Sequence, residues 1–188
     1  MSGFRVVETA PCWRGAFLEV VDAHIVASDG STFQRDVVRH PGAVVIVPVT
    51  EDRTHAILVR QFRAAVDDDL LEVPAGKRDV DGEPPEETAR RELAEEIGYR
   101  PGRLVKLCEF FNSPGFSDEY THLFCALDLE PLAEAHAVTA EEAAMTVEHI
   151  PFTDVDALIE RREIVDAKTI IGLMQARRYL ESTAGRRG

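Results

Sequence analysis

The sequence predicts an α+β protein in which helices lie on both sides of a mixed sheet, an α/β/α sandwich with an N-terminal β segment. Strand-like segments come first, one amphipathic helix follows at residues 86–97, and further strands precede two helices near the end. Residues 43–49 form a continuous apolar run, which is typical of a strand buried on both faces. Because strands and helices do not alternate one by one, this order favours a sandwich over a parallel doubly wound sheet.

The composition limits the class of protein. The 188 residues fit one domain with a small appended segment, and a hydrophobic content of 45% suffices for a core. The net charge of −13 repels nucleic acid backbones, so no nucleic acid partner is expected. No apolar run reaches the roughly 18 residues of a membrane helix, and residues 1–10 lack a signal-peptide core. We therefore expect a cytoplasmic protein without membrane contact.

The strands are predicted from apolar runs bounded by turn residues. Turns at residues 28–30 and 51–53 separate strands in the first part of the chain. A loop at residues 112–119 joins two strands that follow the first helix. The expected strands cover residues 16–21, 32–39, 43–49, 56–59, 70–73, 104–111, 121–129 and 145–151.

Three helices are predicted in the second half of the chain. In the first, Ala89, Leu93 and Ile97 recur every four residues as a buried stripe. Pro84 and Pro85 suit its first turn, and Gly98 ends it. A polar loop at residues 131–143 comes later, followed by helices at residues 154–161 and 166–180 and a flexible tail at residues 181–188.

Three carboxylates share one side of the first helix, since Glu95 and Glu96 lie three and four residues after Glu92. Their repulsion costs roughly a few tenths of a kcal/mol per pair, so a favourable interaction should offset it. A hard divalent cation that prefers oxygen ligands, Mg²⁺ or Mn²⁺, would do so, and Arg91 could bridge to one carboxylate. The ordinary alternative for such a cluster is a solvated acidic helix face.

The residues around this helix resemble the Nudix box, the signature of the Nudix hydrolases. That pattern reads Gly, five residues, Glu, seven residues, then Arg-Glu-aliphatic-any-Glu-Glu-any-Gly-aliphatic. Here seven residues separate Glu83 from Arg91, and residues 91–98 match in full. Two departures occur, because six residues separate Gly76 from Glu83 and Tyr99 takes the last aliphatic position. We expect the loop near residues 79–81 to absorb the extra residue.

The resemblance implies roles for the box residues. Glu92 and Glu96 would be the main ligands of Mg²⁺ or Mn²⁺, with Glu95 as a further ligand or orienting group. The backbone carbonyl of Ala75 would be another ligand, and Arg91 and Glu83 would hold the loop to the helix. The family fold, an α/β/α sandwich, agrees with the order of elements, and residues 41–180 would form the Nudix hydrolase domain.

Four further segments look like those of the ADP-ribose pyrophosphatase branch. Pro114 lies 16 residues after Gly98, and the other three segments are residues 60–63, 71–76 and 166–171. The resemblance implies hydrolysis of ADP-ribose to AMP and ribose 5-phosphate. It also implies a homodimer that exchanges N-terminal strands, so residues 1–40 would be a dimerising β segment.

Substrate contacts follow in part from position and in part from the resemblance. Arg63 ends an apolar strand, where it could grip a phosphate bidentately or be a plain surface charge. By resemblance, Arg39 could reach the substrate across a dimer interface, and the loop at Pro114, Gly115 and Phe116 would contact it. Trp13 and Phe17 could stack on adenine or fill the dimer core.

Hydrolysis also needs a general base. In this branch it comes from a glutamate on a loop distant from the box, for which Glu142 is preferred because it is nearer the strand beginning at Met145. Glu141 is the other candidate, and both could be solvated loop acids. The six histidines and the three isolated cysteines are assigned no chemistry.

Other functions remain open at this stage. A Nudix hydrolase could act on another nucleotide sugar such as GDP-mannose, on a dinucleotide such as NADH, or on an oxidised nucleoside triphosphate, because other loops choose the substituent. A non-catalytic nucleotide-binding regulator would be expected to lose box carboxylates, whereas this chain keeps all of them.

Overall fold

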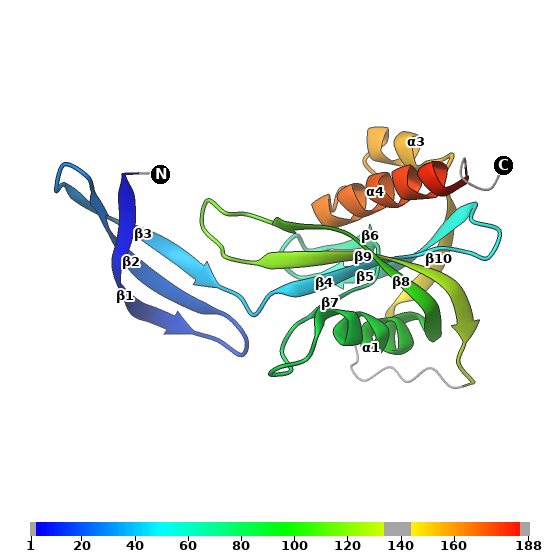
Figure 1. Cartoon of the computed structure of the whole chain (residues 1–188), viewed down its shortest axis with the longest axis horizontal. Helices are drawn as coiled ribbons and strands as arrows, with labels where there is room; N and C mark the ends of the chain where they lie inside the picture. Colours follow the sequence, from blue (N-terminus) through cyan, green and yellow to red (C-terminus); the bar gives the residue numbers. More distant parts are fainter. Residues whose placement is uncertain (1–2, 134–143, 185–188) are drawn as a thin grey trace. The chain divides into compact units, whose positions relative to one another are not determined.

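A computed structural model describes residues 3–133 and 144–184. The chain divides into two compact units. The first consists of Met1–Ala43 with Phe110–Thr121, and the second of Val44–Glu109 with His122–Gly188. Figure 1 shows the elements of each unit.

The first unit contains a three-stranded antiparallel sheet in the order β1-β2-β3. Its strands are β1 (Phe4–Arg14), β2 (Glu19–Ala27) and β3 (Thr32–Arg39). The turn predicted at residues 28–30 is present, with Gly30 at φ 85°. Strand β1 was not predicted. All its residues are exposed, and register shifts at Val6/Glu8 and Pro11/Trp13 interrupt the alternation that marks a strand.

The end of β3 contacts the loop at residues 112–119 within this unit. The N–H of Val38 donates to the carbonyl of Phe116 at 2.7 Å, and the N–H of Asp118 donates to the carbonyl of Val38 at 3.1 Å. The Asp118 carboxylate in turn accepts hydrogen bonds from Arg39 at 2.9 Å and from the backbone N–H of His40 at 2.8 Å. These bonds fix the loop against the strand.

The second unit contains two sheets, with strand orders β10-β5-β6 and β7-β4-β9-β8. The run predicted as a buried strand is β4, and every residue in it is buried. The short strand β7 was not predicted, because its three residues include a glycine and leave no periodic pattern to recognise. The strands are β4 (Ala43–Pro48), β5 (His55–Arg63), β6 (Asp68–Glu72), β7 (Ala75–Lys77), β8 (Tyr99–Phe111), β9 (Tyr120–Pro131) and β10 (Thr146–Pro151).

Helix α1 (Pro85–Ile97) confirms the predicted amphipathic helix. It begins at Pro85 and ends at Gly98, whose left-handed backbone (φ 71°) lets its N–H bond the carbonyl of Leu93. The apolar stripe of Ala89, Leu93 and Ile97 packs against one face of the sheets. Its buried partners there are Val44, Ile46, Ile57, Val59, Phe124 and Ala126.

The opposite face carries helix α4 (Ala167–Ala184), which follows the short helix α3 (Val155–Glu160). A Cβ on Gly172 would meet Val47 at 3.0 Å and Leu123 at 3.4 Å. Since neighbouring residues of a strand point to opposite faces, Val47 and Leu123 face α4 while Ile46 and Phe124 face α1. The sheet therefore lies between α1 and α4, as Figure 1 shows.

Helix α4 is longer than predicted. Residues 181–184 were expected to belong to a flexible tail but are the last helical turn. The hydroxyls of Ser182 and Thr183 bond the carbonyl of Tyr179 at 2.8 and 3.1 Å, and no proline or glycine occurs from residue 173 to residue 184. None of the described helices is long and apolar enough to cross a membrane.

Candidate functional site

In the second unit, Arg91 forms ion pairs with several carboxylates on and beside α1. Its Nη1 lies 2.8 Å from Glu92 and 3.1 Å from Glu95, and its Nη2 lies 3.5 Å from Glu83. One guanidinium thus offsets repulsion among three acids. It also ties the loop before the helix to the helix itself, which is the arrangement that the box pattern implied.

Strand β7 lies directly against the carboxylates of α1. The N–H of Ala75 donates to Glu96 Oε2 at 3.2 Å, and a Cβ placed on Gly76 would overlap the carboxyl group of Glu92. Glycine is therefore required at position 76 because a backbone and a buried acid meet there. The structure brings Ala75, Glu92 and Glu96 together, and these are three of the predicted metal ligands.

Glu92 is only 12% exposed in its side chain. The pKa of Glu92 is raised to about 7, mainly by burial and also by the nearby Glu95 and Asp79, while Arg91 opposes the shift. A buried acid with a strongly raised pKa has little water to stabilise its charge. A bound cation would supply that stabilisation.

The donor atoms suit a hard divalent cation. Glu92, Glu95, Glu96 and the backbone carbonyl of Ala75 offer oxygen alone, which Mg²⁺ and Mn²⁺ prefer. Within residues 3–133 and 144–184, no three acidic, histidine or cysteine side chains already form a metal cage. Arg91 holds Glu92 and Glu95 instead, so a cation would compete with this guanidinium for the same oxygens.

Arg63 is held by a second acid. Its Nε and Nη2 bond the two carboxylate oxygens of Glu72 at 2.8 and 2.6 Å, a bidentate pair in which Glu72 is 1% exposed. The Glu72 pair raises the pKa of Arg63 despite its burial, and Asp166 and Glu96 act in the same direction. Glu72 therefore fixes the orientation of Arg63, and the charge of Glu96 on α1 acts on the same guanidinium.

No role was predicted for Glu72 or for Thr169, yet both position this region. The buried hydroxyl of Thr169 accepts the N–H of Val73 at 3.0 Å and donates to Asp166 at 2.8 Å. Asp166 also accepts the N–H of Thr169 at 2.8 Å, which caps the start of α4. The sequence did offer a sign of the role of Glu72, because a charged residue stands inside the apolar run 70–73. No local pattern indicated that Thr169 bonds Val73, because the two residues are 96 positions apart.

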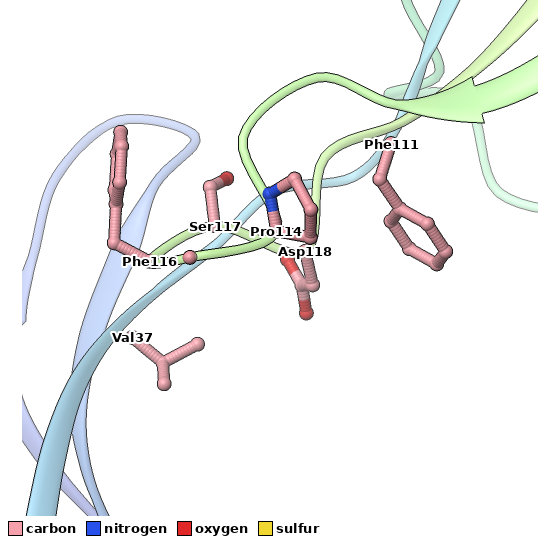
Figure 2. Close-up of a pocket in the computed structure, with 7 residues that line it drawn as sticks. Val37, Phe111, Pro114, Phe116, Ser117 and Asp118 are labelled. Carbon is pink, nitrogen blue, oxygen red and sulfur yellow. The ribbon is translucent and has the colours of Figure 1, made fainter.

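In the first unit, the predicted substrate loop lines an open hollow of about 200 Å³ (Figure 2). Pro114, Gly115 and Phe116, all predicted to contact substrate, line it together with Val37, Phe111, Ser117 and Asp118. Phe116 is 58% exposed. An apolar side chain this exposed is available to a ligand.

A second hollow in this unit, of about 360 Å³, brings together Arg39 and Phe17. Phe17 packs edge-on against His40 with ring centroids 5.8 Å apart, and Arg39 pairs with Asp118. Trp13 lies in exposed strand β1, where its ring would collide with a Cβ on Gly15. The two candidate base residues, Glu142 and Glu141, lie outside the described residues.

Comparison with known proteins decides the family. The model of the NUDIX domain matches residues 39–170, which include both α1 and β7. The chain belongs to the Nudix family. The family prediction made from residues 76–98 is thereby confirmed.

Relatives and a solved structure agree with this assignment. The chain is 39% identical over 165 residues to the ADP-ribose pyrophosphatase of Bacillus subtilis, covering 88% of each. It is also 32% identical over 163 residues to the GDP-mannose pyrophosphatase of Citrobacter koseri, covering 79% of this chain and 82% of that protein.

The crystal structure of an ADP compounds hydrolase matches with a TM-score of 0.83, 22% identity and 97% coverage of each chain. This likeness confirms the predicted α+β fold with a mixed sheet. The chain is a Nudix hydrolase.

Proposed function

We propose that this Nudix hydrolase cleaves the pyrophosphate bond of ADP-ribose to give AMP and ribose 5-phosphate, using Mg²⁺ or Mn²⁺. The observation that carries the proposal is the contact of β7 with α1, where Ala75 and Gly76 meet Glu96 and Glu92. The relative named ADP-ribose pyrophosphatase, which is similar over most of the chain, supports the substrate.

Nudix hydrolases generally use divalent cations, and the residues here fit them. Glu92, Glu96 and the carbonyl of Ala75 would bind the cation, with Glu95 as a further ligand or orienting group. When bound, a divalent cation neutralises the diphosphate charge and activates water for attack. Arg91 keeps Glu92 and Glu95 in place between turnovers.

The reaction itself is a hydrolysis. A water oxygen forms a bond to one phosphorus, the bridging P–O bond breaks, and the second phosphate leaves with the bridging oxygen. Glu142 is the proposed acceptor of the water proton, with Glu141 as the alternative. Arg63, oriented by Glu72, would bind a phosphate oxygen.

In the first unit, Arg39, Phe17 and the loop at residues 114–116 stay proposed substrate contacts, as the resemblance implied. Arg39 and Phe17 line one hollow, and Pro114, Gly115 and Phe116 line another. We also propose a homodimer, which the exposed apolar residues Phe4, Val6, Val7 and Trp13 of β1 support, because a second copy could cover them. The cytoplasmic location stays a prediction.

GDP-mannose is the second candidate substrate, because a GDP-mannose pyrophosphatase is also similar over most of the chain. The test is a product assay over ADP-ribose, GDP-mannose, NADH and an oxidised nucleoside triphosphate, with Mg²⁺, with Mn²⁺ and with a chelator. We expect AMP release from ADP-ribose to exceed every other rate and to stop with chelator. Faster turnover of GDP-mannose would replace the proposed substrate, and no turnover of any compound would favour a nucleotide-binding regulator.

A further inference from the structure

The guanidinium of Arg78 lies beside the Nudix box. Arg78 is half-buried in the loop after β7, the loop that carries the extra residue of this box. None of the described carboxylates forms an ion pair with it. Its Nη2 reaches the carbonyl of Glu83 and its Nη1 reaches Nε2 of His122, each at 3.4 Å, and its Nε is buried without a hydrogen-bond partner.

The contrast with Arg63 shows what is unusual here. Arg63 makes two short bonds to a buried carboxylate, whereas Arg78 makes two long ones to neutral acceptors. Leaving a partly desolvated guanidinium so poorly satisfied is costly unless another anion completes its hydrogen bonds. The fork of a guanidinium matches the oxygens of a phosphate.

His122 holds Arg78 on the side of the sheet that faces α1. His122 alternates along β9 with Phe124 and Ala126, both of which pack on α1, so all three side chains point to that face. Its Nδ1 lies 2.6 Å from Glu109. With the proton on Nδ1, its Nε2 is the acceptor for Arg78.

Arg78 and Lys106 place positive charge beside His122. Burial lowers the pKa of His122, and Arg78 and Lys106 lower it further against the opposing effect of Glu109. Lys106 pairs with Glu109 at 2.7 Å and Arg91 with Glu83 at 3.5 Å, so each of these nearby acids has another cation as its ion-pair partner. An anion is therefore the ligand that the cluster would attract.

Arg78 is also connected to the carboxylates of α1. The carbonyl of Glu83 accepts a hydrogen bond from Arg78, and the carboxylate of Glu83 accepts one from Arg91. Arg91 in turn forms an ion pair with Glu92. This chain of contacts links Arg78 to the carboxylate that is proposed to bind the cation.

We propose that Arg78, supported by His122, binds a phosphoryl oxygen of the diphosphate substrate beside the box carboxylates. This inference rests on the proposed hydrolase function and adds a substrate-binding residue to it. The phosphoryl group could belong to the AMP half or to the ribose 5-phosphate half of ADP-ribose, and the two products distinguish these sources.

The kinetic test compares wild type, Arg78→Gln, Arg78→Lys and the control Arg103→Gln, which changes an exposed arginine of β8. With ADP-ribose, Arg78→Gln should raise KM about tenfold or more, the loss of one charge-assisted bond, with a smaller change in kcat. The KM of Arg78→Lys should lie between those of wild type and Arg78→Gln, because a point charge cannot bind bidentately. The KM of Arg103→Gln should match that of wild type. A KM within twofold of wild type in Arg78→Gln would overturn the inference.

Calorimetry separates this inference from the hydrolase function. Binding of AMP and of ribose 5-phosphate is measured with Ca²⁺ for wild type, Arg78→Gln and Arg78→Lys. Weaker binding of either product to Arg78→Gln supports the inference even if no turnover is found, and shows which half contacts Arg78. Unchanged binding of both products overturns it. If Arg78→Gln does not fold, Arg78→Lys decides in the same way, and wild-type affinity in that variant overturns the inference.

Discussion

The Cα of Gly76 faces the carboxyl group of Glu92 so closely that a Cβ on the glycine would overlap it. The contact joins a three-residue strand to the helix that carries the box. It places the acid against the backbone of β7, the strand whose Ala75 carbonyl is proposed as a ligand.

Gly76→Ala should displace Glu92, because a methyl group would occupy the position of its carboxylate. We expect metal-dependent turnover to fall at least about tenfold with weaker binding of Mn²⁺, measured by calorimetry. Gly115→Ala is the steric control for stability, since a Cβ there would contact nothing within 4 Å. Normal Mn²⁺ affinity in Gly76→Ala would show that Glu92 is not a ligand or can move freely.

Glu96→Gln should abolish metal-dependent turnover while leaving the fold intact. The amide oxygen can still accept the N–H of Ala75, so the strand stays in place while the charge is lost. We expect a loss of about a hundredfold or more in kcat/KM, several kcal/mol of transition-state stabilisation. Near-normal activity with an unchanged melting temperature would rule out the metal assignment.

Glu142→Gln should lower kcat with little change in substrate binding, because the amide cannot take the proton from water. A general base is worth about 10²–10⁴-fold. The same assay on Glu141→Gln is the matched control. An unaffected rate in Glu142→Gln together with a slow Glu141→Gln would move the role by one residue, and two unaffected rates would mean that neither acts as the base.

Thr169→Val should destabilise the protein and loosen the segment that leads to β7. The buried N–H of Val73 loses its acceptor, which costs about 1–3 kcal/mol in the free energy of unfolding. Thermal and urea unfolding measure the loss. Thr169→Ser restores the hydroxyl and should recover most of the stability, so equal instability of both variants would mean that packing, not the hydrogen bond, decides.

Because of Asp166, the free energy of unfolding should depend on pH in the acid range. Burial favours a higher pKa, but the Lys168 ammonium and the hydrogen bonds from Thr169 outweigh it and hold the pKa of Asp166 below the ordinary 3.8. Because the folded pKa is the lower one, the stabilisation is present above pH 3.8 and is lost as the pH falls through the folded value.

The difference in unfolding free energy between wild type and Asp166→Asn should therefore be largest near neutral pH and shrink below pH 4. Urea unfolding from pH 7 down to pH 3 measures it. A difference that stays constant over this range would show that the Asp166 charge contributes nothing to stability.

Local patterns were sufficient for several elements. The four-residue spacing of Ala89, Leu93 and Ile97 predicted α1, and the flanking proline and glycine predicted both of its ends. Strand β4 followed from an unbroken apolar run. Strand β1 was not predicted, because its exposed residues and shifted register carry no such pattern.

What the sequence by itself determined is the set of carboxylates on one face of α1, since helical spacing fixes which side chains share a face, and the family that this set indicates. The tertiary structure alone decided which backbone meets them. Four contacts join residues that are up to 96 positions apart: Gly76 with Glu92, Arg63 with Glu72, Val73 with Thr169 and Arg78 with His122. Such pairs depend on strand register and on helix packing across a sheet, which no local pattern encodes.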